Sequence, residues 1–149
     1  MDQWLDESIP VEELKGFERK FKAEKSDTGA VSDDTKFSYA WALIRSRYKD
    51  DVTQGISMME GLCKSSSSQR DFLYFIACGY YRLEEYETSL KTVDKILASE
   101  PRNRQALDLK GLIKKRLKRD GLMGMAIVGG GVAVAAAAVG LFAVAFSKK

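Results

Sequence analysis

The chain has 149 residues, the size of one ordinary domain, and 45% of them are hydrophobic, which argues against an intrinsically disordered chain. The formal net charge is only +3, but residues 1–101 hold 14 basic and 19 acidic side chains, whereas residues 102–119 hold eight basic and one acidic. There is no histidine, so the commonest metal ligand and general base is missing, and we expect neither a metal centre nor a cofactor.

The first nine residues form an acidic N-terminal arm. A signal peptide or a mitochondrial presequence would be basic at this position, so we expect a cytosolic main domain with both cysteines reduced. Apolar residues alternate with the acids in this arm. Our hypothesis is that the arm covers a groove on the body and competes with partners there, through Trp4, Leu5 and Ile9.

Residues 10–119 show helical periodicity almost throughout and contain only two prolines, which predicts an all-α bundle of six helices. Polar breaks at 26–34 and 65–68 separate the helices. The first helix begins at Pro10, four others run at about 35–48, 52–64, 69–83 and 86–99, and the sixth begins at Pro101 and continues through the basic segment.

A 34-residue period relates the helices of 35–64 to those of 69–99, and this is the length of a tetratricopeptide repeat. The second unit matches that pattern well, and the first matches weakly. Gly55 and Ser89 are the small residues expected where the two helices of each unit cross. A generic bundle with a coincidental period is the alternative. The other packing positions are Tyr39, Ala42, Leu43, Ser46, Val52, Met59, Leu62, Leu73, Ile76, Ala77, Tyr80, Tyr86, Val93 and Ile96.

The helix predicted at 69–83 is apolar on more sides than a surface helix should be. The first helix of each tetratricopeptide pair lines the concave face, so we predict an aromatic partner-binding groove, edged by Arg47 and Arg82, for a peptide of apolar and acidic character. The alternative is that these aromatic side chains are ordinary core. The predicted groove residues are Ala40, Ile44, Arg47, Tyr48, Tyr74, Phe75, Cys78, Tyr81 and Arg82.

Residues 122–146 carry no charge and predict a transmembrane helix. Their 25 residues would make a helix about 38 Å long, enough to cross a bilayer core of about 30 Å. A buried core helix, the alternative, needs neither all-round apolarity nor charged flanks. We therefore expect a single-pass, tail-anchored protein with its N-terminal domain in the cytosol, because the basic flank before the span is much larger than the tip at 147–149. The expected membrane collar is Lys114, Lys115, Arg116, Lys118, Arg119, Lys148 and Lys149.

The span is rich in alanine and glycine. Gly129, Ala133 and Ala137 lie four residues apart, and such a stripe of small residues lets helices approach closely in lipid. Weak homo-oligomerisation is one interpretation, and a span that only inserts is the other.

Catalytic and nucleic-acid-binding signals are weak. Carboxylate pairs such as Asp33–Asp34 and Asp50–Asp51 stand at predicted helix starts, where acids are favourable for structural reasons. The basic segment beside a membrane span is better explained by anionic headgroups than by nucleic acid. We therefore expect neither an enzyme nor a nucleic-acid-binding protein.

Several runs of residues are specific enough to compare with known families. They are FSYAWALIRSRY at 37–48, QRDFLYFIACGYYRLEEY at 69–86, EPRN at 100–103 and KRDGLMGMAIVGG at 118–130. Together they resemble the mitochondrial fission 1 protein family over almost the whole chain.

This resemblance implies a six-helix cytosolic bundle with two tetratricopeptide-like repeats, tail-anchored in the mitochondrial outer membrane and the peroxisomal membrane. It also implies an adaptor that recruits a dynamin-related GTPase, its adaptor proteins, or both, to divide the organelle. Two other functions stay open: an apoptosis-type regulator, and a membrane-remodelling protein that acts through its span.

Overall fold

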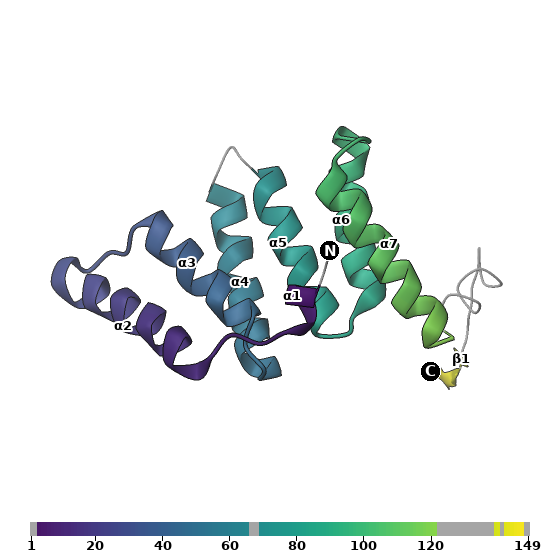
Figure 1. Cartoon of the computed structure of the whole chain (residues 1–149), viewed down its shortest axis with the longest axis horizontal. Helices are drawn as coiled ribbons and strands as arrows, with labels where there is room; N and C mark the ends of the chain where they lie inside the picture. Colours follow the sequence, from purple (N-terminus) through teal and green to yellow (C-terminus); the bar gives the residue numbers. More distant parts are fainter. Residues whose placement is uncertain (1–2, 66–68, 122–138, 141, 148–149) are drawn as a thin grey trace. The chain divides into compact units, whose positions relative to one another are not determined.

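A computed structural model describes residues 3–65, 69–121, 139–140 and 142–147, and it divides into two units, Met1–Lys110 and Gly111–Lys149. A short helix in the arm precedes six longer helices, the last of which begins in the first unit and continues into the second (Figure 1). The helices are α1 (Gln3–Asp6), α2 (Val11–Thr28), α3 (Asp33–Ile44), α4 (Lys49–Ser65), α5 (Gln69–Arg82), α6 (Tyr86–Ser99) and α7 (Arg104–Arg119).

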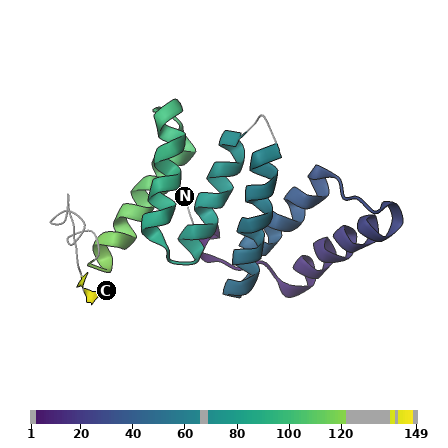
Figure 2. The same cartoon turned by 180° about the vertical axis from the view of Figure 1, so that it is seen from behind.

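The six predicted helices of the body are all present as α2 to α7, and the predicted repeats are the helix pairs α3–α4 and α5–α6. From α2 to α6, each helix packs against the next one in the chain. Figures 1 and 2 show this row of neighbouring helices from its two sides. The all-α prediction and the repeat assignment are therefore confirmed for the described part of the body.

Several helix ends differ from the predictions, and α2 and α3 occupy residues 26–28 and 33–34 of the break predicted at 26–34. Local hydrogen bonds explain two of the other differences. The third predicted helix begins at Lys49 rather than Val52, and Asp51 in its first turn accepts a 2.7 Å hydrogen bond from the hydroxyl of Ser46. The sixth begins at Arg104 rather than Pro101, because the side chain of Asn103 accepts the N–H of Ala106 at 2.9 Å and so caps the helix. The second predicted helix ends at Ile44 instead of Tyr48.

The two predicted crossing points are where the helices of each pair come closest. A Cβ placed on Gly55 would lie 2.7 Å from the carbonyl oxygen of Ala40, so α3 and α4 approach as closely as backbones allow. In the second pair, Ser89 is fully buried and its hydroxyl donates a 2.7 Å hydrogen bond to the carbonyl of Ala77. A larger residue at either position would push the two helices apart.

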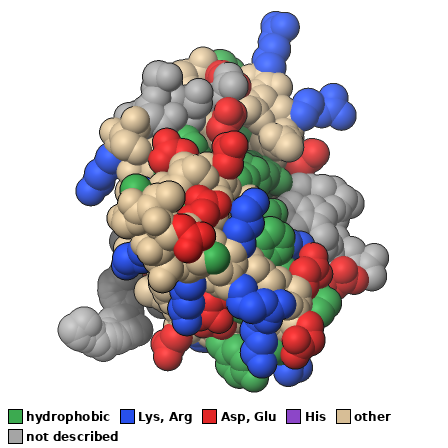
Figure 3. Space-filling model, turned by 90° about the vertical axis from the view of Figure 1, so that its left-hand side faces the viewer, with side chains coloured by type: hydrophobic (Ala, Val, Ile, Leu, Met, Phe, Trp, Pro, Cys, Tyr) green, Lys and Arg blue, Asp and Glu red, His purple; other side chains and the backbone are tan. Residues whose placement is uncertain are grey.

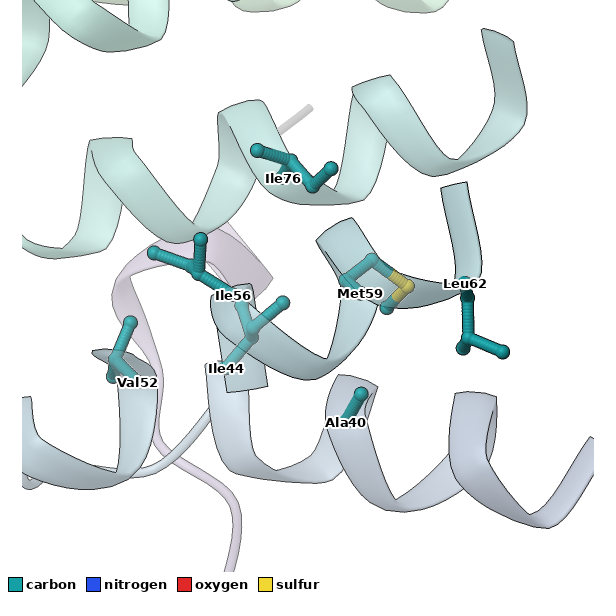
Figure 4. Packing of buried hydrophobic residues seen from close by; sticks show 7 residues of the cluster. All are labelled: Ala40, Ile44, Val52, Ile56, Met59, Leu62 and Ile76. Atoms are coloured by element: carbon teal, nitrogen blue, oxygen red, sulfur yellow. The ribbon is translucent and has the colours of Figure 1, made fainter. Parts of the chain in front are cut away.

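The centre of the first unit is a cluster of buried aliphatic side chains between α3, α4 and α5 (Figure 4). Of the predicted packing positions, all are buried except Leu73 and Tyr80, which are half-buried. The apolar stripes therefore identify the core correctly, with those two exceptions on α5. The cluster consists of Ala40, Ile44, Val52, Ile56, Met59, Leu62 and Ile76.

Helix α2 is an outer layer on α3 and buries none of its residues completely. The ring of Phe21 lies 5.0 Å from that of Tyr39, and Gly29 ends the helix with a φ of 75°, a left-handed conformation that glycine adopts without strain. On the face shown in Figure 3, Lys and Arg side chains lie among Asp and Glu, with hydrophobic side chains exposed between them. Helix α2 thus shields one side of the repeats.

Most of the predicted membrane span, 122–138 and 141, lies outside the described residues, as do Lys148 and Lys149. The described remainder forms two short strands paired in parallel, β1 (Val139–Gly140) and β2 (Phe142–Ser147), which differs from the helix predicted there. Valine and phenylalanine recur in this stretch, and both favour strands more than the alanines before it. Within the part of the chain that the structure describes, none of the helices is long and apolar enough to span a bilayer.

Candidate functional site

An open hollow with a volume of about 390 Å³ lies between α3, α5 and the start of α7. All of its lining residues belong to the first unit. Its size falls within the range of pockets that hold ligands or the anchoring side chains of a partner. We call it the aromatic hollow, and it is lined by Asp33, Asp34, Phe37, Asp71, Phe72, Tyr74, Phe75, Asn103 and Gln105.

The wall of the aromatic hollow is a set of rings that pack edge to face. Phe75 stands at its centre, with its ring centroid 5.1 Å from that of Phe37, 4.8 Å from that of Trp41 and 5.5 Å from that of Tyr74. Phe72 joins the same wall at 6.0 Å from Phe37. Such geometry favours each aromatic pair beyond its buried area, so the wall is held in place before any partner arrives.

The rim of the aromatic hollow is acidic. Asp33 and Asp34 lie in the first turn of α3, and Asp71 lies in the first turn of α5, and all three are exposed. Acids are stabilised at helix N-termini, so helix formation explains why they are there. Their combined charge nevertheless favours a partner with basic side chains, which differs from the apolar and acidic peptide expected from the sequence.

Arg82 binds the N-terminal arm instead of standing free at the groove edge. Its Nη1 donates to the carbonyl oxygens of Leu5 at 2.6 Å and Glu7 at 2.8 Å. Its Nη2 donates to the carbonyl oxygens of Arg45 and Ser46, both at 3.1 Å. Burial lowers the pKa of Arg82 from its ordinary value, and nearby Asp6 opposes that shift. One guanidinium thus joins the arm, α5 and the turn after α3.

The arm itself is packed onto the body. Leu5 is only 1% exposed and Ile9 is 7% exposed, and the N–H of Ile9 donates to the carbonyl of Arg45 at 2.9 Å. The hydroxyl of Tyr81 donates to Asp6 at 3.4 Å. Trp4 belongs to α1, and its side chain lies outside the described part. The arm therefore lies over Tyr81 and Arg82, and its competition with partners stays a prediction.

The other predicted groove residues lie in three different environments. Tyr74 and Phe75 line the aromatic hollow. Ala40, Ile44 and Cys78 are completely buried, and the first two belong to the core cluster. The third environment is the turn after α3, where Arg47 and Tyr48 are exposed. The guanidinium of Arg47 lies 6.0 Å from the ring centroid of Tyr48.

Most of the residues that line the aromatic hollow were not predicted from the sequence. Phe37 and Trp41 lie one helical turn apart and outside the packing stripe of their helix. Apolar residues outside the packing stripe are also the pattern from which the groove on the helix at 69–83 was predicted. No pattern in the sequence points to the contribution of α7. The lining residues that were not predicted are Asp33, Asp34, Phe37, Asp71, Phe72, Asn103 and Gln105.

The described collar residues lie on the last turns of α7. Arg116 is half-buried, and the others are exposed, as a membrane-proximal basic segment requires. Their contact with lipid stays a prediction. The exposed residues are Lys114, Lys115, Lys118 and Arg119.

Comparison with solved structures finds the same fold in yeast Fis1. In a complex of yeast Fis1 with an Mdv1 fragment, the Fis1 fold matches with a TM-score of 0.69 and 26% identity, over 82% of this chain and 99% of that one. In a complex of yeast Fis1 with a Caf4 fragment, the match has a TM-score of 0.54 and 27% identity, over 60% of this chain and 91% of that one.

Sequence comparison agrees over a greater length. The mitochondrial fission 1 protein of Rattus norvegicus is 49% identical over 150 aligned residues, which cover 99% of this chain and 98% of that protein. Models of the Fis1 N-terminal and C-terminal tetratricopeptide repeats match residues 34–66 and 70–122. The first match coincides with the pair α3–α4, the second spans α5, α6 and α7, and the chain belongs to the mitochondrial fission 1 protein family.

Proposed function

We propose that this chain is a non-enzymatic adaptor that recruits the fission machinery to mitochondria through the concave side of its two repeats. Membership of the mitochondrial fission 1 protein family supports a role in mitochondrial fission. Structures of yeast Fis1 in complex with fragments of Mdv1 and Caf4 support the docking of adaptor proteins. The expected partners are a dynamin-related GTPase, its adaptor proteins, or both. The observation that carries the proposal is the open aromatic hollow between α3, α5 and α7.

The shape and charge of the aromatic hollow define what would dock there. Its four rings offer an apolar surface for one or two large side chains, and interfaces concentrate binding energy in such pockets. Three aspartates around the rings favour lysine or arginine beside the apolar anchors. We therefore propose a partner segment in which a bulky apolar residue is followed or preceded by a basic one.

The arm is a second element of this proposal. It occupies the surface around Tyr81 and Arg82 at the C-terminal end of α5, whereas the aromatic hollow at the N-terminal end of that helix stays open. A partner longer than the hollow would have to displace the arm and replace the hydrogen bonds that Arg82 makes. Removal of residues 1–8 should therefore raise the affinity of such a partner and leave that of a hollow-only peptide unchanged.

Membrane attachment completes the proposed function. We propose that residues 122–146 anchor the protein in the mitochondrial outer membrane, and also in peroxisomes, with residues 1–120 in the cytosol. The basic side chains on α7 support this topology because positive charge is retained on the cytosolic side. An anchor raises the local concentration of the docking surface without any additional contact. Weak homo-oligomerisation through Gly129, Ala133 and Ala137 remains part of this proposal.

The decisive experiment replaces Phe72 and Phe75 by alanine and measures recruitment of the dynamin-related GTPase to mitochondria in cells that lack the endogenous protein. Each aromatic anchor contributes about 2 kcal/mol at an interface, so the loss of both should lower the affinity by about 4 kcal/mol, or about a thousandfold. Val11→Ala removes an exposed apolar side chain elsewhere and serves as the control. Normal recruitment and fission by the double variant would favour a protein that acts through its span.

A charge variant separates loss of docking from loss of folding. Asp33→Lys with Asp71→Lys keeps the aromatic wall and reverses the charge at two exposed rim positions. It should retain the helical circular dichroism of the parent and still recruit the GTPase poorly. Recruitment at the parent level would contradict the proposed basic partner segment.

A further inference from the structure

Helices α3 and α5, the first helices of the two repeats, carry opposite charges at their two ends. Asp33, Asp34 and Asp71 lie in their first turns and line the aromatic hollow together. Arg45 directly follows α3, and Arg82 is the last residue of α5. Arg82 donates two hydrogen bonds to the turn after α3, so the C-terminal ends also lie together. The two helices therefore run in the same direction, with an acidic end and a basic end.

Aromatic side chains connect these two ends into one surface, which we call the inner face. The guanidinium of Arg45 lies 5.6 Å from the ring centroid of Trp41, whose ring lies 4.8 Å from that of Phe75. Phe75 in turn lines the aromatic hollow. From Asp33 to Arg45 the chain rises through three helical turns, which corresponds to about 18 Å. The inner face thus offers a basic end, a row of rings and an acidic end.

The acidic N-terminal arm lies over the basic end of the inner face. Arg82 donates to the carbonyl oxygens of Leu5 and Glu7, and the charge of Asp6 opposes the effect of burial on the pKa of Arg82. The buried Nε atoms of Arg45 and Arg82 have no hydrogen-bond partner within the described part of the chain. If the arm leaves, further guanidinium donors lose their acceptors. A carboxylate is the strongest replacement that a partner could supply.

A helix with an ordinary distribution of charge matches the inner face in only one direction. The helix macrodipole favours acids in the first turn of a helix and bases in its last turn. Laid antiparallel to α3 and α5, such a helix places its acids beside the two arginines and its bases beside the three aspartates. Laid parallel, it would bring like charges together at both ends. About 12 residues of helix span the distance between the charged ends.

We propose that the partner segment is an amphipathic helix that binds antiparallel to α3 and α5, with acids in its first turn and bases in its last. The inference rests on the proposed function, because the apolar residues before the basic turn are those that enter the aromatic hollow. The acidic turn then takes the place of the arm at Arg82. Docking thus begins at the open hollow with the basic half of the helix, and the acidic half completes it by displacing the arm.

The test determines the direction of a bound helix by crosslinking to the full-length chain, purified in a neutral detergent. The probe is a synthetic helical peptide of about 16 residues with glutamates in its first turn, leucines on one face and lysines in its last turn. A benzophenone group at its N-terminal end should crosslink near Arg45 and Arg82, as located by mass spectrometry. The same group at its C-terminal end should crosslink to the first turns of α3 and α5. Reversed or evenly mixed crosslinks would overturn the proposed direction.

Charge variants test the pairing at the acidic end. Asp33→Lys with Asp71→Lys should lower the affinity of the peptide at least about tenfold. Asp50→Lys with Glu87→Lys is the matched control, because both residues are exposed acids in the first turns of the other helices, α4 and α6. This control changes the net charge equally and should not weaken binding. Equal weakening by both double variants would contradict pairing at the inner face.

A second peptide tests the order of charges in the partner. It carries lysines in its first turn and glutamates in its last, with the same leucines between them. It should bind at least about tenfold more weakly, because either direction opposes the macrodipole or the charges of the inner face. Equal affinity of the two peptides would overturn the proposal. An extended segment has no macrodipole and would give that result.

Two further measurements separate this inference from the proposed function. Saturation with the first peptide should accelerate amide exchange in residues 3–9 at least about tenfold, and unchanged exchange would refute displacement of the arm. Phe72→Ala with Phe75→Ala should abolish binding of the peptide. If binding needs these rings but the crosslinks are reversed, only the direction is wrong. If the peptide does not bind, or binds the ring variant equally well, the proposed docking surface is wrong too.

Discussion

Replacement of Gly55 by alanine tests how closely the helices of the first repeat cross. The new Cβ would lie 2.7 Å from the carbonyl oxygen of Ala40 and 2.9 Å from both Cγ1 of Ile44 and Cβ of Leu43. Neither the carbonyl nor a Cβ can rotate away, so α3 must move off α4. Overpacking of this kind costs about 3 kcal/mol, and alanine recovers about 1 kcal/mol of helix propensity.

The expected net loss for Gly55→Ala is therefore about 2 kcal/mol, or a fall in Tm of about 8 °C for a domain of about 120 residues. Gly61 in the same helix is the matched control, because a Cβ there would meet no atom within 4 Å. Gly61→Ala should stabilise the protein by about 0.5–1 kcal/mol. The measurement is urea denaturation of residues 1–121 followed by circular dichroism, and equal stabilisation by both substitutions would refute the close crossing.

Three further predictions concern single side chains. Arg82→Ala removes the hydrogen bonds that fix the arm, each of about 1.5 kcal/mol or more, so amide exchange in residues 3–9 should accelerate at least about tenfold by mass spectrometry. Ser89→Ala leaves the carbonyl of Ala77 without its side-chain donor, and urea denaturation should show a loss of about 1 kcal/mol. Hydrogen bonds from Thr35 and from the N–H of Ser32 lower the pKa of the Glu24 carboxyl. Because the pKa of Glu24 is lower in the folded state, this carboxylate stabilises the fold above about pH 4.3, and the stabilisation is lost as the pH falls through the lowered pKa. The Glu24→Gln variant should therefore lose less stability over that pH range. An NMR titration of Glu24 should give a midpoint below its ordinary pKa.

The repeats were predictable because their packing positions recur with a fixed period. Met59 and Val93 are apolar at equivalent places, as are Leu62 and Ile96, and the small residues at the two crossings are required by close backbone approach. Helix ends were less predictable, since they depend on single hydrogen bonds. The side chain of Asn103 moves one helix start by three residues, and nothing in the apolar pattern reports it.

The candidate site was only partly predictable, for a physical reason. Periodicity states which side of a helix is apolar, and it does not state whether another element covers that side. Ala40 and Ile44 have the pattern of groove residues and are core, because α4 packs directly on them. Arg82 has the pattern of a free groove cation, and the carbonyl groups that it binds lie 36 to 77 residues earlier in the chain.

The unusual apolar character of α5 now has a structural explanation. Helix α5 packs against α4 and α6, also contacts α3 and α1, and is open on the rest of its surface. On one open side its rings form the aromatic hollow, beneath three aspartates. On another side, the half-buried side chains of Leu73 and Tyr80 line a groove between α4 and α6. A helix that served only the core would need one apolar stripe, and the proposed docking role of the aromatic hollow accounts for the aromatic residues outside that stripe.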